Sequence, residues 1–382
     1  MPVINLPPYE SMSPGARKMR DFYACKPNAP IYQREFGFYV LDRWRAEGHI
    51  PENISKADFA ALFGYDPPGT YSLGNLGWVV AEFEPVFEEK ILEDQGDHEL
   101  VQDFAGRTTK CFKGRRIGFM PEYVDHPVKD QKTWEEKCLW RMDPSSPERL
   151  PKIKEAIKNA SVAAAEGQII CANLVGAYMY LRSLIGPVDL LYIFYDNPEL
   201  IHRCMEAWFH LADTVYTEMQ KEIVFDEVFI GEDICYNHGL LISPDMVREF
   251  LFPYYQQLLS NIKSRQLDKT RTLHFNVDTD GFSDVAIPLY MEIGMDYLNP
   301  FEVASGCDVV RTGREYPKLL IHGGFDKRIL ATSKDAIDRE VDRIMPVMMK
   351  RGGYIPTCDH GVPWEVSFEN YLHYRKRMLE FA

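Results

Sequence analysis

The second half of the chain alternates between two patterns, amphipathic segments of helical length and short apolar runs. The amphipathic segments carry apolar residues at helical spacing, and they cover residues 149–166, 198–221, 243–264, 282–293 and 334–351. Short apolar runs are typical of buried strands, and they occupy 168–173, 228–230, 271–277, 296–298, 319–322 and 354–356. We therefore expect strands and helices to alternate from about residue 148 onward.

This alternation predicts right-handed βαβ units and a parallel sheet. Eight strands can be counted if residues 31–32 and one segment of the less regular first half are included, which favours a (β/α)8 TIM barrel over an open sheet. The sequence contains no G-x-G-x-x-G or G-x-x-x-x-G-K-[ST] motif, the signature of nucleotide-binding open folds. We predict an α/β fold, with residues 1–382 forming one barrel domain that has an N-terminal extension.

Residues 68–123 follow a different pattern. Trp78–Phe83 and the segment 110–120 are typical of antiparallel strands around turns such as Gly114-Arg115-Arg116. We predict that residues 68–123 form a small β-rich insertion or cap on the barrel.

Composition excludes several classes of function. The 382 residues are 46% hydrophobic and 26% charged, which is typical of a globular protein with a large core. A net charge of −14 argues against nucleic acid or an anionic membrane as a partner. The eight cysteines include no C-x-x-C pair, and no apolar run reaches the roughly 18 residues of a membrane span. We expect a cytoplasmic protein with reduced thiols.

Polar side chains follow the predicted strands directly. They are Glu232-Asp233, Asp278, Asp280, Glu302, Asp326-Lys327 and Asp359-His360. The carboxyl ends of all barrel strands meet on one face, where active sites are built. These groups would therefore share one mouth, and such a cluster needs a cation, a basic partner or a shared proton. His360, Lys327 and a bound metal are the candidates.

Several of these residues also have a purely structural interpretation. A carboxylate just after a strand is equally typical of a helix N-cap, as at Asp280. His360 fits a hydrogen-bonded structural histidine as well as a ligand. By strand alternation His274 points to the same side as Asp278, either toward a substrate or into packing. Cys358 is not expected to be a nucleophile, because the neighbouring Asp359 raises a thiol pKa.

The motifs together resemble the uroporphyrinogen decarboxylase-like superfamily. The resemblance rests on Glu232-Asp233, Leu241-Ile242-Ser243-Pro244, 250–255, Asp278-Thr279-Asp280-Gly281, Asn299-Pro300-Phe301-Glu302, Gly323-Gly324-Phe325-Asp326-Lys327, 353–356 and Asp359-His360. It looks closest to the branch of corrinoid-dependent, O-demethylase-type methyltransferases, which Arg34-Glu35-Phe36-Gly37 and Met120-Pro121-Glu122 also resemble. The Arg-Gln-Ala-Gly-Arg-Tyr element of true uroporphyrinogen decarboxylases is missing, and an acidic mouth would repel a polycarboxylated tetrapyrrole.

The resemblance implies a metal site with altered ligands. Zinc methyltransferases of the superfamily hold the metal with a His-x-Cys-Gly element and a later cysteine. Asp278-Thr279-Asp280-Gly281 and His360 stand in those places here, so oxygen ligands replace soft ones. Zinc accepts Asp and His, although harder cations compete for such a site. We predict Asp278, Asp280 and His360 as the metal ligands.

The resemblance also implies a reaction. We expect a methyltransferase that moves a methyl group from a small methylated substrate, such as an aryl methyl ether, to the cobalamin of a separate corrinoid protein. The leaving oxygen needs a Lewis acid or a proton donor. The predicted catalytic residues are Asp233, Glu302, Glu232 and Lys327, and the predicted substrate-binding residues are Phe36, Tyr236, Trp364 and His274.

Two alternatives remain open at this point. One is a decarboxylase that acts on another substrate and uses Lys327 or an aspartate as proton donor. The other is a non-catalytic ligand-binding subunit. The fold suggests a homodimer, and the sequence identifies neither the methyl donor nor the corrinoid partner.

Overall fold

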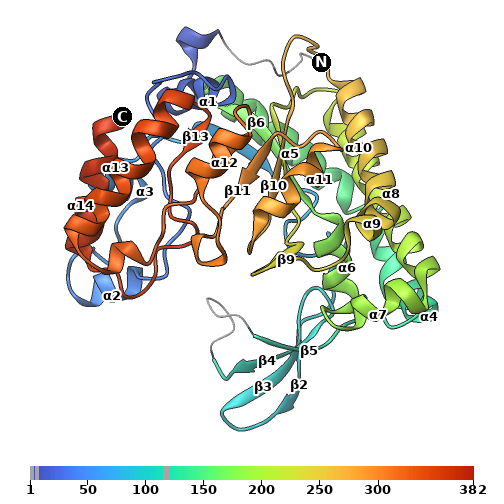
Figure 1. Ribbon diagram of the computed structural model, residues 1–382. Helices are drawn as coiled ribbons and strands as arrows, with labels where there is room; N and C mark the ends of the chain where they lie inside the picture. The colour runs from blue at the N-terminus through green and yellow to red at the C-terminus, as the bar shows by residue number, and fades with distance from the viewer. Residues whose placement is uncertain (1–3, 5–7, 115–120) are drawn as a thin grey trace.

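A curled parallel sheet forms the centre of the protein in the computed structural model, which describes residue 4, residues 8–114 and residues 121–382 (Figure 1). Its strands follow the order β1 (Thr70–Leu73), β6 (Ile169–Val175), β7 (Glu227–Gly231), β10 (His274–Asp278), β11 (Tyr297–Asn299), β12 (Leu320–His322) and β13 (Tyr354–Ile355). All six neighbouring pairs are parallel. The α/β architecture and the strands expected after residue 148 are confirmed.

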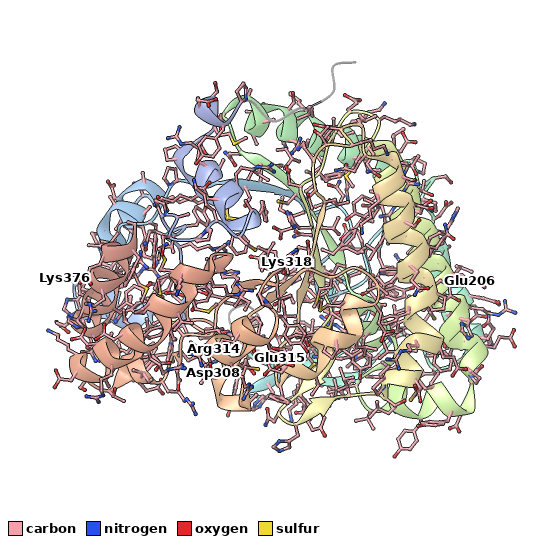
Figure 2. All side chains as sticks on the ribbon, turned by 45° about the horizontal axis from the view of Figure 1, so that its top comes forward. Glu206, Asp308, Arg314, Glu315, Lys318 and Lys376 are labelled. Carbon is pink, nitrogen blue, oxygen red and sulfur yellow. The ribbon has the colours of Figure 1, made fainter. Side chains whose placement is uncertain are left out.

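Helices cover the outer face of this sheet. They include α5 (Arg149–Ala165), α6 (Ala177–Ile185), α7 (Asp189–Asp196), α8 (Pro198–Met219), α10 (Phe252–Arg265), α11 (Ala286–Met291), α12 (Val309–Glu315), α13 (Lys334–Arg351) and α14 (Phe368–Met378). Figure 2 shows Glu206 of α8 and Lys376 of α14 pointing outward on opposite flanks, as expected for helices that pack onto the sheet with their other face. The helix expected over 243–264 is divided into α9 (Pro244–Met246), a π-helical turn over Val247–Leu251, and α10.

Helix α1 (Pro14–Tyr23) closes the amino-terminal end of the sheet. Ser13 caps the helix by accepting the Ala16 amide hydrogen. Its buried face packs with the first residues of three strands, Ile169, Tyr297 and Leu320. The opposite end of the strands is thereby left as the accessible mouth.

The prediction of a strand at residues 31–32 is wrong, because this extended segment joins no strand ladder. It nevertheless contacts both edges of the sheet. On the β1 side, the Gly69 amide donates to the Tyr32 hydroxyl at 3.0 Å. On the β13 side, the Cys358 amide donates to Glu35 Oε1 at 2.8 Å, and Phe38 forms a parallel bridge with Val362. A side-chain hydrogen bond on the β1 side, and a side-chain hydrogen bond with one isolated bridge on the β13 side, stand in place of an eighth strand.

The antiparallel insertion begins later in the chain than the predicted residue 68. Thr70–Leu73 belongs to the parallel sheet, and no strand forms over Trp78–Phe83. The antiparallel sheet consists of β2 (Lys90–Asp94), β3 (His98–Gln102), β4 (Thr108–Phe112) and β5 (Glu122–Asp125), and it projects below the main body in Figure 1. The strand predicted over 110–120 falls partly on residues 115–120, which lie outside the described residues, as does Met120 of the family motif.

The remaining short elements connect these layers. Helices α2 (Leu41–Ala46) and α3 (Lys56–Phe63) precede β1, α4 (Gln131–Thr133) follows β5, and the hairpin β8 (Cys235–Tyr236) to β9 (Gly239–Leu240) follows β7. All eight cysteines are free, as predicted. Among the described helices, none combines the length and apolar character needed to cross a membrane.

Replacing Tyr32 with phenylalanine tests how the two sheet edges are joined. Tyr32→Phe removes the acceptor of the buried Gly69 amide and should lower the free energy of unfolding by about 1–3 kcal/mol. Urea unfolding measures this change. Tyr9→Phe, which removes an exposed hydroxyl contact to Asp21, is the matched control and should change little. Equal stability of the two variants would contradict the assigned role.

Candidate functional site

A cavity of about 270 Å³ opens at the carboxyl ends of the strands. Strand register explains its position, because Asp278 of β10 is paired with Gly231 of β7 and with Asn299 of β11. Only glycine fits at position 231, because a Cβ there would lie 2.5 Å from the Trp78 carbonyl oxygen. The lining residues are Phe36, Gly37, Phe38, Tyr39, Trp78, Val79, Met179, Gly231, Asp233, Asp278, Asp280, His360 and Gly361.

Three aspartates meet in this cavity, as predicted for Asp233, Asp278 and Asp280. The Asp280 amide donates to Asp233 Oδ1 at 3.4 Å. Burial, together with the charges of Asp233 and Glu302, raises the pKa of Asp280 to about 7, against the opposing charges of Lys327 and Arg182. Burial also raises the pKa of Asp278 well above its usual value, with Asp280 and Asp233 as further causes. The cluster therefore retains protons near neutral pH.

His360 faces the same cluster. Its Nε2 lies 3.9 Å from Asp280 Oδ2, and its Nδ1 is hydrogen-bonded to the Tyr39 hydroxyl at 2.9 Å. The Phe36 ring packs 5.0 Å from the imidazole, centroid to centroid. Burial lowers the pKa of His360, and the Lys327 charge lowers it further, although Glu302 and Asp233 oppose this shift. The imidazole is therefore mainly neutral at pH 7.

Lys327 links two further predicted carboxylates. Its Nζ lies 3.6 Å from Glu302 Oε1 and 3.8 Å from Asp359 Oδ1. Glu302 accepts the Gly281 amide hydrogen at 3.0 Å, and Asp359 accepts those of Val303 and Lys327. Backbone donors thus hold both carboxylates beside the ammonium group. Asp326 instead pairs with Arg328, Nη2 to Oδ2 at 2.8 Å.

Glu232 does not line the cavity. It is fully buried and accepts hydrogen bonds from the Tyr255 hydroxyl, from the Tyr290 hydroxyl at 2.7 Å and from the Tyr178 amide at 3.2 Å. These groups come from α10, α11 and α6. Burial raises the pKa of Glu232 to about 7, against the hydrogen bonds from Tyr255 and Tyr290. Glu232 joins three helices behind the mouth.

The four predicted substrate-binding residues do not lie together. Phe36 lines the mouth, whereas Tyr236 lines a separate surface hollow and Trp364 is 54% exposed. His274 does point inward like Asp278 but lies at the other end of β10, where it stacks on Tyr23 and binds Asp296 at 2.8 Å. Only Phe36 of this set reaches the aspartate cluster.

The predicted metal ligands lie at one place without forming a coordination sphere. Asp278, Asp280 and His360 all line the cavity, and Asp280 and His360 approach within 3.9 Å. Within the described ranges, no three His, Cys, Asp or Glu side chains are arranged to hold a metal ion. The residues as arranged therefore do not fit a resident zinc ion. Cys358 is fully buried, and burial raises its thiol pKa well above the usual value.

A second cavity of about 310 Å³ continues from the mouth into the sheet interior. Phe36, Trp78 and Asp278 line both cavities. The remaining lining residues are Met19, Arg34, Thr70, Ser72, Cys171, Asn173, Glu227, Phe229, Asn276, Tyr297, Asn299 and His322. Sequence analysis missed this cavity, although the signal was present as polar residues at alternate positions within apolar strands.

Comparison with known proteins agrees with this architecture. Residues 118–379 match the family model described as Uroporphyrinogen decarboxylase (URO-D). A curated Uroporphyrinogen decarboxylase from Syntrophotalea carbinolica is 26% identical over 181 residues, which span 47% of this chain and 48% of that protein. The solved structure of a methyltransferase from Methanosarcina mazei aligns over 96% of this chain and 98% of its own, with a TM-score of 0.58 and 14% identity. That likeness shows the fold.

Glu232 should make stability depend on pH. Because folding raises its pKa from 4.5 to about 7, its contribution to stability is complete below 4.5 and is lost as pH rises through 7. Glu232→Gln should remove this dependence, worth about 3 kcal/mol between pH 4.5 and 8. Urea unfolding at several pH values measures it, with the exposed Glu206→Gln as control. Parallel pH profiles for the wild type and Glu232→Gln would refute the assignment.

Proposed function

This chain belongs to the uroporphyrinogen decarboxylase family, and within that family we propose that it is a methyltransferase. It moves a methyl group from a small methylated substrate, such as an aryl methyl ether, to the cobalamin of a separate corrinoid protein. The fold it shares with the Methanosarcina mazei methyltransferase supports this proposal. The observation that carries it is the cluster of Asp233, Asp278 and Asp280 in the mouth, in which the pKa of Asp280 is raised to about 7.

The chemistry of an ether explains why such a cluster is useful. When the C–O bond breaks, the methyl group leaves and the oxygen retains the electron pair as an alkoxide or phenolate. That oxygen is a poor leaving group unless a proton reaches it. With a pKa of about 7, Asp280 is partly protonated at neutral pH and can donate that proton. Asp233 and Glu302 sustain this state by charge repulsion.

Two basic groups near the mouth oppose the effect of this repulsion on the pKa of Asp280. Lys327, held by Glu302 and Asp359, and Arg182, 3.6 Å from Asp233 Oδ2, both lower the pKa of Asp280. Both groups therefore make the Asp280 proton easier to transfer. His360 and Phe36 also line this cavity and pack against each other.

Cobalamin in this proposal is supplied by the partner protein. It provides a reduced cobalt that accepts the methyl group. The sequence has no Asp-x-His-x-x-Gly element for binding it, which agrees with delivery from outside. This chain's own residues bind the methyl donor and hold its oxygen near Asp280. The donated proton leaves with the demethylated product, and the Asp280 carboxylate then takes a new proton from water.

Substituting Asp280 tests the proton donor. Asp280→Asn should slow methyl transfer by about 10²- to 10⁴-fold, which is the usual contribution of a general acid. In the wild type the rate should fall as pH rises through about 7, since only the protonated carboxyl group donates. The measurement is methylcobalamin absorbance after mixing a panel of aryl methyl ethers with a cob(I)alamin-loaded corrinoid protein.

The exposed Asp335→Asn is the matched control and should transfer methyl groups at the wild-type rate. A flat pH profile together with an active Asp280→Asn variant would exclude this carboxyl group as the donor.

A decarboxylase is the second candidate, because the curated relative from Syntrophotalea carbinolica bears that name. It would use Lys327 or an aspartate to protonate the carbanion left by carbon dioxide. Carbon dioxide release without methylcobalamin formation would replace the first proposal with this one. If Asp278→Ala and His360→Ala change neither reaction in a folded protein, the chain is a non-catalytic ligand-binding subunit.

Zinc bound by Asp278, Asp280 and His360 stays a prediction that elemental analysis can decide. The described side chains do not form a coordination sphere, so we expect less than stoichiometric zinc in purified protein. We also expect the same amount in the His360→Ala variant. Stoichiometric zinc that disappears in His360→Ala would show that the three side chains rearrange around a metal.

A further inference from the structure

Tyr39 lines the mouth but belongs to none of the predicted sets of site residues. Its hydroxyl group is hydrogen-bonded to His360 Nδ1 at 2.9 Å. Its ring lies nearly parallel to the imidazole, with 13° between the two planes and 5.8 Å between the centroids. Among the described residues, no second hydrogen-bond partner of this hydroxyl group is found. The polar end of Tyr39 is therefore directed at His360.

The main chain holds Tyr39 against the loop that carries His360. The Tyr39 amide donates to the Val362 carbonyl oxygen at 2.9 Å, and the Val362 amide donates to the Gly37 carbonyl oxygen at 2.8 Å. Glycine at position 361 allows the close approach, because a Cβ there would lie 2.8 Å from the Tyr39 ring. Backbone hydrogen bonds thus bring together two side chains that are 321 positions apart in the chain.

This hydrogen bond decides which nitrogen of His360 carries the hydrogen atom. A neutral imidazole has one N–H group and one acceptor nitrogen, and the Tyr39 hydroxyl can donate to the acceptor. The other nitrogen, Nε2, lies 3.9 Å from Asp280 Oδ2, and Asp233 and Asp278 line the same cavity. An N–H group is attracted by these carboxyl oxygens, whereas a lone pair is repelled. Nδ1 is therefore the acceptor, and Nε2 carries the hydrogen.

We propose that Tyr39 is a positioning residue, which keeps the hydrogen on Nε2 of His360 so that this N–H group donates to the departing oxygen beside Asp280. The inference rests on the proposed function and adds two groups to it. When the ether C–O bond breaks, the oxygen keeps the electron pair and Asp280 supplies its proton. The N–H group stabilises the negative charge that develops on the oxygen and keeps its own hydrogen.

The distance between His360 and Asp280 suits this role. At 3.9 Å, Nε2 and Oδ2 are too far apart for a direct hydrogen bond. The N–H group is therefore not used up by the carboxyl group and can donate to a substrate oxygen that lies beside both.

The same assignment disagrees with His360 as a zinc ligand. A metal-bound imidazole nitrogen carries no hydrogen, and the other ring nitrogen donates to an acceptor. Here Nε2 is the nitrogen that approaches Asp280, and Nδ1 accepts from Tyr39. Tyr39 thus gives a physical reason why the predicted ligands do not form a coordination sphere among the described residues.

Nitrogen NMR of the full-length protein, labelled with ring-¹⁵N histidine, tests the assignment without methyl transfer. Near neutral pH, His360 should give a pyrrole-type signal for Nε2 and a pyridine-type signal for Nδ1, and their loss in His360→Gln identifies them. In Tyr39→Phe the second tautomer should become populated, so both signals should move toward each other. Tyr254→Phe is the matched control, because it removes a hydroxyl group 3.1 Å from His202 Nδ1 and should leave the His360 signals unchanged.

Three spectra would overturn the inference. They are a pyridine-type Nε2 in the wild type, whether from the other tautomer or from a bound metal, pyrrole-type signals at both nitrogens, and an unchanged His360 spectrum in Tyr39→Phe.

The methyl transfer assay provides the kinetic test. Tyr39→Phe should lower kcat about threefold to tenfold, the contribution of one hydrogen bond, and should leave KM for the ether nearly unchanged. His360→Ala should lower kcat about 10²- to 10³-fold, the usual effect of removing one such donor. Tyr254→Phe should transfer methyl groups at the wild-type rate.

The two experiments separate this inference from the proposed function. If Tyr39 controls the His360 tautomer but the wild type demethylates no ether, the assigned hydrogen position stands and the proposed function fails. If ethers are demethylated and Tyr39→Phe has the wild-type kcat, the proposed function stands and the positioning role is overturned.

Discussion

Parallel register between β10 and its two neighbours is the constraint on which the site depends. Pairing Asp278 with Gly231 and Asn299 sets the level of the mouth, and alternation along β10 directs His274, Asn276 and Asp278 into the interior. A shift of one residue would turn all three side chains outward into the helical layer. Both cavities therefore follow from hydrogen bonding of the backbone.

The interior formed in this way has a gradient of charge. Carboxylates gather at the accessible end, where burial and mutual repulsion raise the pKa of Asp280 and Asp278. Farther in, Arg34 and His322 line the same space as the carboxyl group of Glu227, and His322 Nε2 has no hydrogen-bond partner among the described residues. The helix α1 packs against the far end of the strands.

Repetition made the architecture predictable. Apolar runs alternate with amphipathic helices, and each pattern depends on residues close in sequence, so the strands after residue 148 and the mouth at their carboxyl ends could be predicted. The same reasoning failed at residues 31–32, where no strand ladder forms. Hydrogen bonds from Gly69 to Tyr32 and from Cys358 to Glu35 hold this segment instead. It failed again at Thr70–Leu73, whose pairing with β6 depends on residues about a hundred positions away.

The sequence by itself determined that Asp233, Asp278, Asp280 and His360 would share one mouth. Each of them follows a strand directly, and parallel strands end on the same face. Only the tertiary structure decided which neighbouring carboxylates turn away, since Glu232 finds tyrosine hydroxyls on α10 and α11 and Asp326 finds Arg328. It also decided that Arg34 and His322 line the same inner cavity. Hydrogen bonds between distant segments select such orientations, and no local pattern in the sequence encodes them.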